Sequence, residues 1–443
     1  MQLKLMKMVV RFAISFLPLV AFAQAKRPRL ADAEVVRHVN DYIAPLANHE
    51  LSGTLLVARG NRILLERSFG LANYELGVRF TPSTPTNIAS ITKPLTVIIA
   101  ARLSDEKQLS WGDTVSKWLP NYVYGSKMTV KQLIDHRAGV PHRLLPDSEQ
   151  AMPRTAQEMV EIANGVPLLF QPGDSESYSS GGYSILAAVL ERAGKQTYDE
   201  FLQHYVALPV SAKTIRHIDS RMILPGRASS AIPVRDGFIN PPLRDLSFLV
   251  GAGSVYTTPH DIFLVIRGLV NGAYGSTARA ALMEPDGLHW NGEGDGFRTV
   301  ADWYPADSLT VIYFSNLRLG ATDLIRHQIP RIVAGENVRP PVVPQPKAVA
   351  LSAAAQQRLV GDYDTGGGDI NSVAFASPSL MRWGERFLLA LDDSTFYSFA
   401  DYAKVRFRSD STGSVSEIDW SGGTWAMHDE HLHFPKVRRN DSR

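Results

Sequence analysis

Along residues 34–316, apolar and polar positions predict strands, then helices, then strands again. Residues 34–47 follow the period of an amphipathic helix, whereas 53–57 and 63–69 alternate as two strands around the tight-turn signal at 59–62. After a loop rich in Thr and Pro at 81–86, a helical pattern covers about 90–103, and strand patterning returns at about 299–316. This order predicts one α+β domain whose terminal strands share a sheet covered by helices.

Capping patterns mark the start of further helices in the middle of the chain. Thr129 with Gln132, and Thr197 with Glu200, match the capping box at the start of a helix. In this motif each of the two side chains accepts a hydrogen bond from the backbone N–H of the other residue. Thr258 is followed by Pro259, which suits the first position of a helix. We therefore expect helices to begin at these three places.

The pattern changes at residues 339–346, a Pro-rich stretch that indicates a semi-rigid linker. Beyond it, short alternating segments at 387–391 and 404–407 are separated by turn signals at 366–368 and 422–423. These segments predict a small antiparallel β-barrel or sandwich. The expected divisions are a signal peptide at 1–25, a main domain at 26–336, a linker at 337–347 and a β domain at 348–443.

The first 25 residues have the pattern of a secretory signal. Lys4, Lys7 and Arg11 precede an apolar run at 12–23 that ends in small-residue patterns, and the run is shorter than the roughly 20 residues that span a bilayer. Without these three basic residues the formal net charge of +2 becomes −1, and no basic stripe indicates nucleic acid. We expect a periplasmic or secreted protein with no integral membrane segment after signal removal and no nucleic-acid partner.

Ser90 and Lys93 are the first candidates for chemistry. Residues three apart lie on one face of a helix, so the Lys93 amine can reach the Ser90 hydroxyl at the N-terminal end of the 90–103 helix. The spacing alone is weak, because Ser104 and Lys107 share it among charged neighbours, and an N-cap serine with a surface lysine also fits. A hydroxyl beside an amine is the arrangement of an activated nucleophile.

Two further segments add candidates. Tyr178 lies after Pro172-Gly173 and before an apolar helix at about 184–192. Beside a lysine ammonium the pKa of its phenol can fall, so that it acts as a base. A packing role is the simpler interpretation of this residue. The segment 289–297, His-Trp-Asn-Gly-Glu-Gly-Asp-Gly-Phe, predicts a loop or bulged strand beside which a substrate can lie, or an ordinary glycine-rich hairpin.

In this order and spacing the motifs resemble class C β-lactamases and the related penicillin-binding DD-peptidases, D-aminopeptidases and serine-lysine esterases. The resemblance runs from about Gly53 to Asn316 and includes the segments 133–141 and 251–258. It implies a β-lactamase/transpeptidase-like fold, an antiparallel sheet flanked by helices, with a C-terminal lipocalin-like β-barrel. It also implies that Ser90 is the acylated nucleophile and that Lys93 and Tyr178 share proton transfer. The Ser90 N–H would form half of an oxyanion hole completed near Glu293 or Gly294.

Two departures from the family pattern concern the substrate. The usual Tyr-x-Asn reads Tyr178-Ser179-Ser180, so a short hydroxyl replaces an amide. In the third motif Trp290 takes the position of a cationic residue, as in esterases of this family with Trp-Gly-Gly, and an indole cannot pair with a carboxylate as an ammonium can. A one-residue bulge would turn His289 inward instead. The substrate-binding candidates are therefore Ser180, His289, Trp290, Asn291, Gly292, Glu293 and Gly294.

Together these features predict a serine hydrolase that cleaves an ester or a small or D-configured amide through an acyl-enzyme on Ser90. Two alternatives stay open: a DD-peptidase or β-lactamase acting on peptidoglycan peptides or β-lactams, and a catalytically silent penicillin-binding-like binding protein. The partner is then a small-molecule ester, amide or cell-wall peptide. The histidines lack the usual ligand spacing, and the chain has no cysteine, so no metal or cofactor is expected. No feature of the sequence indicates an oligomeric state.

Overall fold

The computed structural model describes residues 30–47, 51–234, 237–294, 296–342, 346–366, 369–384, 386–421 and 431–437. The expected signal peptide at 1–25 lies outside these residues, as do parts of the expected turns at 366–368 and 422–423.

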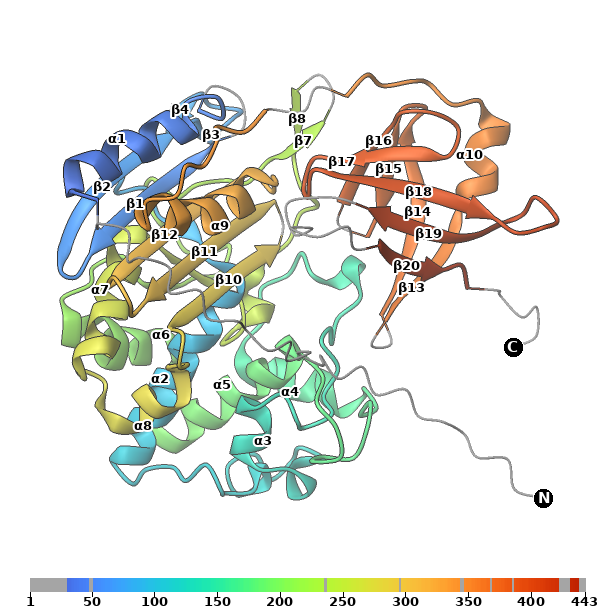
Figure 1. Ribbon diagram of the computed structural model, residues 1–443. Helices are drawn as coiled ribbons and strands as arrows, with labels where there is room; N and C mark the ends of the chain where they lie inside the picture. The colour runs from blue at the N-terminus through green and yellow to red at the C-terminus, as the bar shows by residue number, and fades with distance from the viewer. Residues whose placement is uncertain are drawn as a thin grey trace, which may run out of the picture.

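The main domain is built on a five-stranded antiparallel sheet in the order β10-β11-β12-β1-β2 (Figure 1). The N-terminal hairpin pairs with the strands that return late in the chain, because β1 is hydrogen-bonded to β12 along its whole length. The predicted sharing of one sheet by both ends of the domain is therefore present. The five strands are β1 Gly53–Arg59, β2 Arg62–Phe69, β10 Leu288–Gly294, β11 Phe297–Tyr304 and β12 Leu309–Ser315.

Helices cover both faces of this sheet. Because side chains alternate along a strand, Leu55 and Val57 of β1 pack with α1 and α9, whereas Leu56 and Ala58 face the larger core around α2. Ten of the fourteen residues of α2 are buried, so this helix runs through the centre of the domain rather than along its surface. The helices of this domain are α1 Asp32–Ile43, α2 Thr92–Asp105, α3 Val130–Ile134, α4 Ala156–Asn164, α5 Ser180–Gly194, α6 Tyr198–Phe201, α7 Pro259–Asn271, α8 Gly275–Leu282 and α9 Ala321–Val333.

The predicted helix starts are present. Thr129 and Thr197 form capping boxes with Gln132 and Glu200 at the starts of α3 and α6, and the Thr258 side chain accepts from the Asp261 N–H at the start of α7. Short strands lie in the segments between the longer elements: β3 Leu71–Asn73, β4 Val78–Arg79, β5 Thr86–Asn87, β6 Arg216–His217, β7 Ile232–Val234, β8 Gly237–Ile239 and β9 Val255–Thr257.

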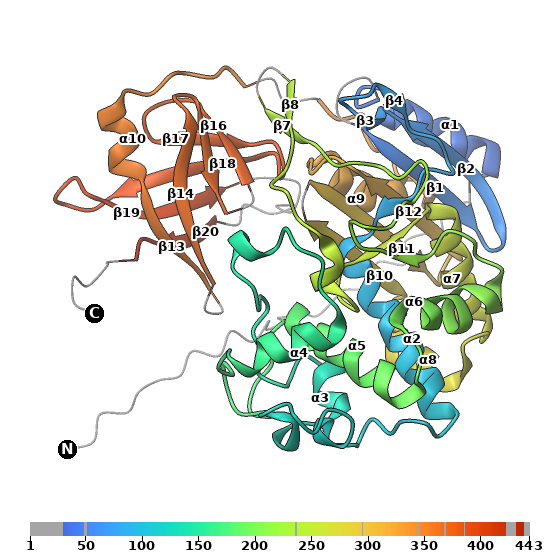
Figure 2. The same ribbon diagram turned by 180° about the vertical axis from the view of Figure 1, so that it is seen from behind.

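The C-terminal strands form an eight-stranded antiparallel sheet that curves into a nearly closed barrel (Figures 1 and 2). Its first and last strands meet through a bridge between Tyr363 and Lys436. Helix α10, Ala353–Leu359, contributes Ala355 and Leu359 to the barrel core. The strands are β13 Gly361–Gly366, β14 Asp369–Ser377, β15 Leu380–Trp383, β16 Arg386–Ala390, β17 Thr395–Ser398, β18 Ala403–Ser409, β19 Val415–Ser421 and β20 His431–Pro435. Among the described residues, no helix is long and apolar enough to cross a membrane.

The close approach of β1 and β12 requires glycine at position 53. Gly53 has φ of +146°, and a Cβ on this residue would lie 1.9 Å from the Phe314 carbonyl oxygen. Because backbone strain and overpacking each cost about 1–3 kcal/mol, Gly53→Ala should lower the free energy of unfolding by at least about 2 kcal/mol in urea denaturation. Gly60→Ala is the control: φ is +58° there, but the space is open, and a loss of only about 1 kcal/mol is expected. Equal losses in both variants would contradict the steric argument.

Candidate active site

Ser90 lies at the N-terminal end of the central helix, held there by a strained turn. A 3₁₀ turn, Ala89–Ile91, leads directly into α2, and Ala89 has φ of +44°, which is rare for a residue with a Cβ. The turn is fixed by Asn87, whose Oδ1 accepts from the Ala89 N–H at 2.9 Å and whose amide donates to the Gly253 and Val255 carbonyls. The nucleophile candidate therefore sits on a rigid support at the positive end of a helix dipole.

The Lys93 amine lies beneath Ser90, one helical turn along the chain. Its Nζ donates to Ser90 Oγ at 3.2 Å, to Ser180 Oγ at 3.1 Å and to the Ala252 carbonyl at 3.0 Å. Only 4% of the residue is exposed, and this burial lowers the pKa of Lys93 to about 7. The amine can therefore hold or release a proton near neutral pH, as a general base must.

Tyr178 approaches Ser90 from the opposite side of the cleft. Its hydroxyl donates to Ser90 Oγ at 2.7 Å, and Lys93 Nζ lies 4.6 Å from the centre of its ring. Burial raises the pKa of Tyr178, although its hydrogen bond to Ser90 acts in the other direction. The predicted lowering of this pKa is therefore wrong: the phenol stays protonated and is placed to donate a hydrogen bond.

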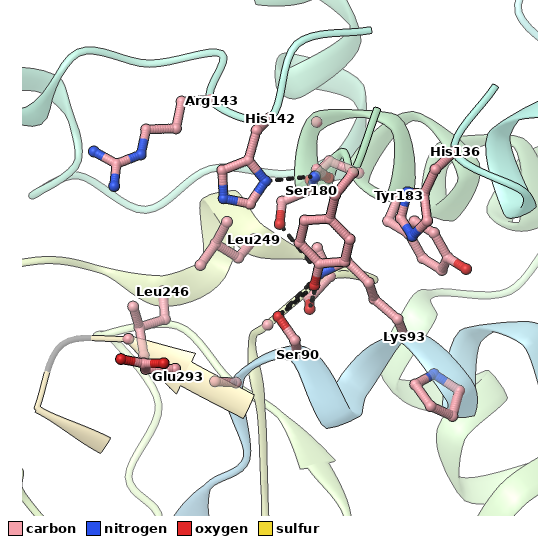
Figure 3. A pocket seen from close by; sticks show the side chains of 18 of the residues that line it. Ser90, Lys93, His136, His142, Arg143, Ser180, Tyr183, Leu246, Leu249 and Glu293 are labelled. Carbon is pink, nitrogen blue, oxygen red and sulfur yellow. Dashed lines mark hydrogen bonds between the residues drawn. The ribbon is translucent and has the colours of Figure 1, made fainter. Parts of the chain in front are cut away.

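Two histidines support the Tyr178 segment, and sequence reasoning did not include them among the site residues. The Nδ1 atoms of His136 and His142 accept from the Ser179 and Ser180 N–H groups at 3.1 and 3.2 Å, and Figure 3 shows the contact of His142 with Ser180. Both rings lie against the Tyr178 ring. Burial, followed by the charge of Lys93, lowers the pKa of His136 to about 4. His136 is therefore neutral, as an Nδ1 acceptor requires. Its place in the family-like segment 133–141, with His142 six residues later, was the available signal.

Strand β10 forms the other wall beside Ser90. A Cβ on Gly292 would lie 3.0 Å from the Ser90 backbone nitrogen and 2.2 Å from the Ile88 carbonyl oxygen, so glycine is required at this contact. The predicted loop or bulge is absent from the described part of the strand, because β10 pairs with β11 in continuous register from Leu288 to Gly294. The segment 288–294 is a regular strand next to the nucleophile.

Without a bulge, His289 is not turned toward Ser90. Its Nδ1 lies 3.6 Å from Asp302 Oδ1, and its Nε2 lies 3.5 Å from Asp286 Oδ2. The hydrogen bond to Asp302 raises the pKa of His289, although burial opposes this. Trp290 is largely buried and packs with the core around α2.

These walls enclose an open cleft of about 640 Å³, with Ser90 and Lys93 at its base (Figure 3). Of the residues predicted from sequence, the structure brings Ser90, Lys93, Tyr178 and Ser180 into one hydrogen-bonded cluster and places His289, Trp290, Asn291, Glu293 and Gly294 along the cleft wall. The Ala252 carbonyl and the side chains of Arg143, Leu246 and Leu249 were not predicted. Among the described residues, no cluster of His, Asp and Glu is placed to hold a metal ion.

Comparison with known proteins gives a family match that covers most of the main domain. The family model described as Beta-lactamase matches residues 35–329. Penicillin-binding protein 4* of Bacillus subtilis (strain 168) is 27% identical over 179 residues, which are 39% of this chain and 40% of that protein, so the match spans well under half of that relative.

Two solved structures share the fold. The crystal structure of SurE aligns with a TM-score of 0.59 at 20% identity and covers 91% of this chain and 99% of that chain. D-amino acid amidase from Ochrobactrum anthropi SV3, complexed with L-phenylalanine amide, aligns with a TM-score of 0.54 at 17% identity over 65% of this chain and 92% of that chain.

The position of Lys93 leads to a pH prediction. Only a neutral amine can accept the Ser90 proton, and the pKa of Lys93 is about 7, so modification of Ser90 by a fluorophosphonate should rise with pH and reach half of its maximum near pH 7. Lys93→Met should remove this titration and lower the maximal rate at least about 100-fold. Lys107→Met is the matched control, because Lys107 belongs to the other Ser-x-x-Lys and is exposed. A wild-type rate that does not change between about pH 5 and 9 would count against Lys93 as the base.

Proposed function

The chain belongs to the Beta-lactamase family of serine hydrolases, and from this premise we propose that it hydrolyses an ester or a small or D-configured amide through an acyl-enzyme on Ser90. The observation that carries the proposal is the position of the Ser90 hydroxyl, which contacts both the Lys93 amine and the Tyr178 hydroxyl. A nucleophile between a neutral base and a protonated acid has both partners that acyl transfer requires.

In the acylation step, Ser90 Oγ attacks the substrate carbonyl carbon while its proton passes to the neutral Lys93 amine. The new bond joins Oγ to the acyl carbon, and the bond to the leaving alcohol or amine breaks. Tyr178 donates its proton to the leaving group and recovers one from Lys93. The lowered pKa of Lys93 favours a neutral amine, which can act as the base. The raised pKa of Tyr178 favours a protonated phenol, which can act as the acid.

Deacylation uses the same base with water as the nucleophile. The water gives one proton to the neutral Lys93 amine, and its oxygen forms a bond to the acyl carbon. The bond between that carbon and Ser90 Oγ then breaks, and Lys93 returns the proton to Ser90 Oγ. The Ser90 N–H, at the start of the 3₁₀ turn, and the backbone of β10 at Glu293 or Gly294 form the proposed oxyanion hole. The contact of Gly292 with the Ser90 backbone supports this pairing of the turn with the strand.

Two side chains lack groups that would bind a penicillin or a C-terminal D-alanine peptide: Ser180 lacks an amide for the acylamino substituent, and Trp290 lacks a positive charge for the carboxylate. Ser180 keeps the contact with Lys93 but has no amide group to bind an acylamino substituent. Trp290 offers an indole N–H in place of a cation. The fold is shared with a protein named D-amino acid amidase, which supports small D-configured amides beside esters.

Labelling tests the nucleophile. A fluorophosphonate should modify wild type, and mass spectrometry should map the adduct to Ser90, because its hydroxyl is the one activated by Lys93. The adduct should vanish in Ser90→Ala and survive in Ser104→Ala, the serine of the second Ser-x-x-Lys on the same helix. Wild type that stays unlabelled at several pH values would instead support a binding protein without catalytic activity.

Substrate comparison tests the chemistry. A short-chain chromogenic ester should be cleaved at least about 100-fold more efficiently, in kcat/KM, than a penicillin or a D-Ala-D-Ala peptide, because a lost carboxylate contact costs about 2–5 kcal/mol. The Ser90→Ala variant supplies the background for each substrate. Rapid acylation by penicillin would replace this proposal with the β-lactamase or DD-peptidase alternative.

A further inference from the structure

The strand beside the nucleophile is tied to a buried ionic network on its opposite face. Successive side chains of β10 alternate, so Gly292 faces the Ser90 turn whereas Glu293 lies on the other face with Arg298, at the edge of the sheet where it also borders the cleft. There Glu293 forms an ion pair with Arg318, and in the β10–β11 register it stands directly opposite Arg298. Burial alone would raise the pKa of Glu293, but the charges of Arg318, Arg298 and Arg386 lower it to about 2.

Arg298 connects this strand pair to the C-terminal barrel. Its side chain is 7% exposed; one guanidinium nitrogen donates to Asp323 Oδ2 of α9 at 2.6 Å, and another donates to the Ala400 carbonyl of the barrel at 2.5 Å. The second nitrogen also lies 3.7 Å from Asp401 Oδ1. A single buried guanidinium therefore joins β11, α9 and the barrel.

Asp401 is itself fixed from within the barrel. It is fully buried, and its Oδ2 accepts from Ser398 Oγ at 2.8 Å and from Arg386 Nε at 3.2 Å. Nearby, the Gly320 N–H donates to the Phe399 carbonyl at 3.1 Å, and the Tyr402 ring leaves no room for a Cβ on Gly320. Figures 1 and 2 show the barrel beside the ends of β10 and β11 where this contact is made.

We propose that Asp401 of the barrel is a positioning residue for the hydrolytic site, because through Arg298 it holds β10 against the backbone of Ser90. The proposal rests on the proposed function, since it assigns the barrel a part in that same reaction. Removing the charge of Asp401 leaves a buried guanidinium with less opposite charge, and breaking such a pair is far more disruptive than losing an exposed one. The resulting shift of β10 is transmitted to Gly292, which has no free space on its Ser90 side.

The test variant is Asp401→Asn, which keeps the size of the side chain and its ability to accept from Ser398. With a short-chain chromogenic ester, kcat should fall about tenfold or more, because small misplacements near reacting atoms cost up to about 100-fold. KM should change much less, since the barrel residue does not touch the substrate. The pH of half-maximal rate should stay where wild type has it, because the contacts of Lys93 are untouched.

The matched control is Asp419→Asn. Asp419 is an equally buried aspartate of the same barrel, but it pairs with Arg408 and lies on β19 rather than beside Arg298. It should lose thermal stability without the fall in kcat. If Asp401→Asn does not fold, Arg386→Gln is the second variant. Arg386 is partly exposed and pairs with Asp401, so its loss frees Asp401 and should lower kcat in the same way.

The outcomes separate the two proposals. Wild type without ester turnover or a Ser90 adduct overturns the proposed function itself. Active wild type together with an Asp401→Asn variant whose kcat lies within about twofold of wild type overturns the positioning role alone. The same conclusion follows if the loss of rate only matches the loss of folded protein measured by circular dichroism.

Discussion

The proposed chemistry of this site depends on an amine that is removed from water without a negative charge beside it. In the described chain, Lys93 Nζ is hydrogen-bonded to two serine hydroxyls and one backbone carbonyl, all of them uncharged. A nearby carboxylate would favour the ammonium form and keep the proton on Lys93 at neutral pH. Burial among dipoles disfavours the ammonium form instead, and this explains why the pKa of Lys93 falls to about 7.

The surrounding architecture maintains this burial. The central position of α2 surrounds Lys93 with protein, and the segment carrying Ala252 covers it, since Thr96 of the same helix also donates to the Gly251 carbonyl at 2.6 Å. His136 and His142 support the site without a hydrogen bond to Lys93. By accepting the Ser179 and Ser180 N–H groups, they fix the start of α5, which holds Ser180 over the lysine and Tyr178 over Ser90.

Local signals in the sequence were enough for much of the fold. The hairpin at 53–69, the capped helices and the returning strands each depend on patterns within a few residues, and the structure has all of them. Ser90, Lys93 and Tyr178 could be selected because their motifs occur in a known order. The direction of the Tyr178 pKa could not be predicted, because it depends on how the folded chain removes the hydroxyl from water, whereas the sequence indicated only the nearby lysine. For the segment 289–297 the expected loop or bulge was wrong, whereas the alternative of a glycine-rich hairpin agrees with the pairing of β10 and β11. The need for glycine at 292 could not be predicted, because it depends on the close approach of the Ser90 turn.

The charges at the contact between main domain and barrel have a consequence for assembly. Among the described residues, the main domain contributes Glu293, Asp323, Arg298 and Arg318 to the network around Asp401, and the barrel contributes Asp401 and Arg386. A separate ion pair joins Arg382 of the barrel to Asp147 of the main domain at 3.6 Å, with both side chains partly exposed. Salt screens exposed charges far more than buried ones. The exposed pair of Arg382 and Asp147 should therefore weaken in salt, whereas the buried contacts of Arg298 should hold the barrel against the main domain at any physiological ionic strength.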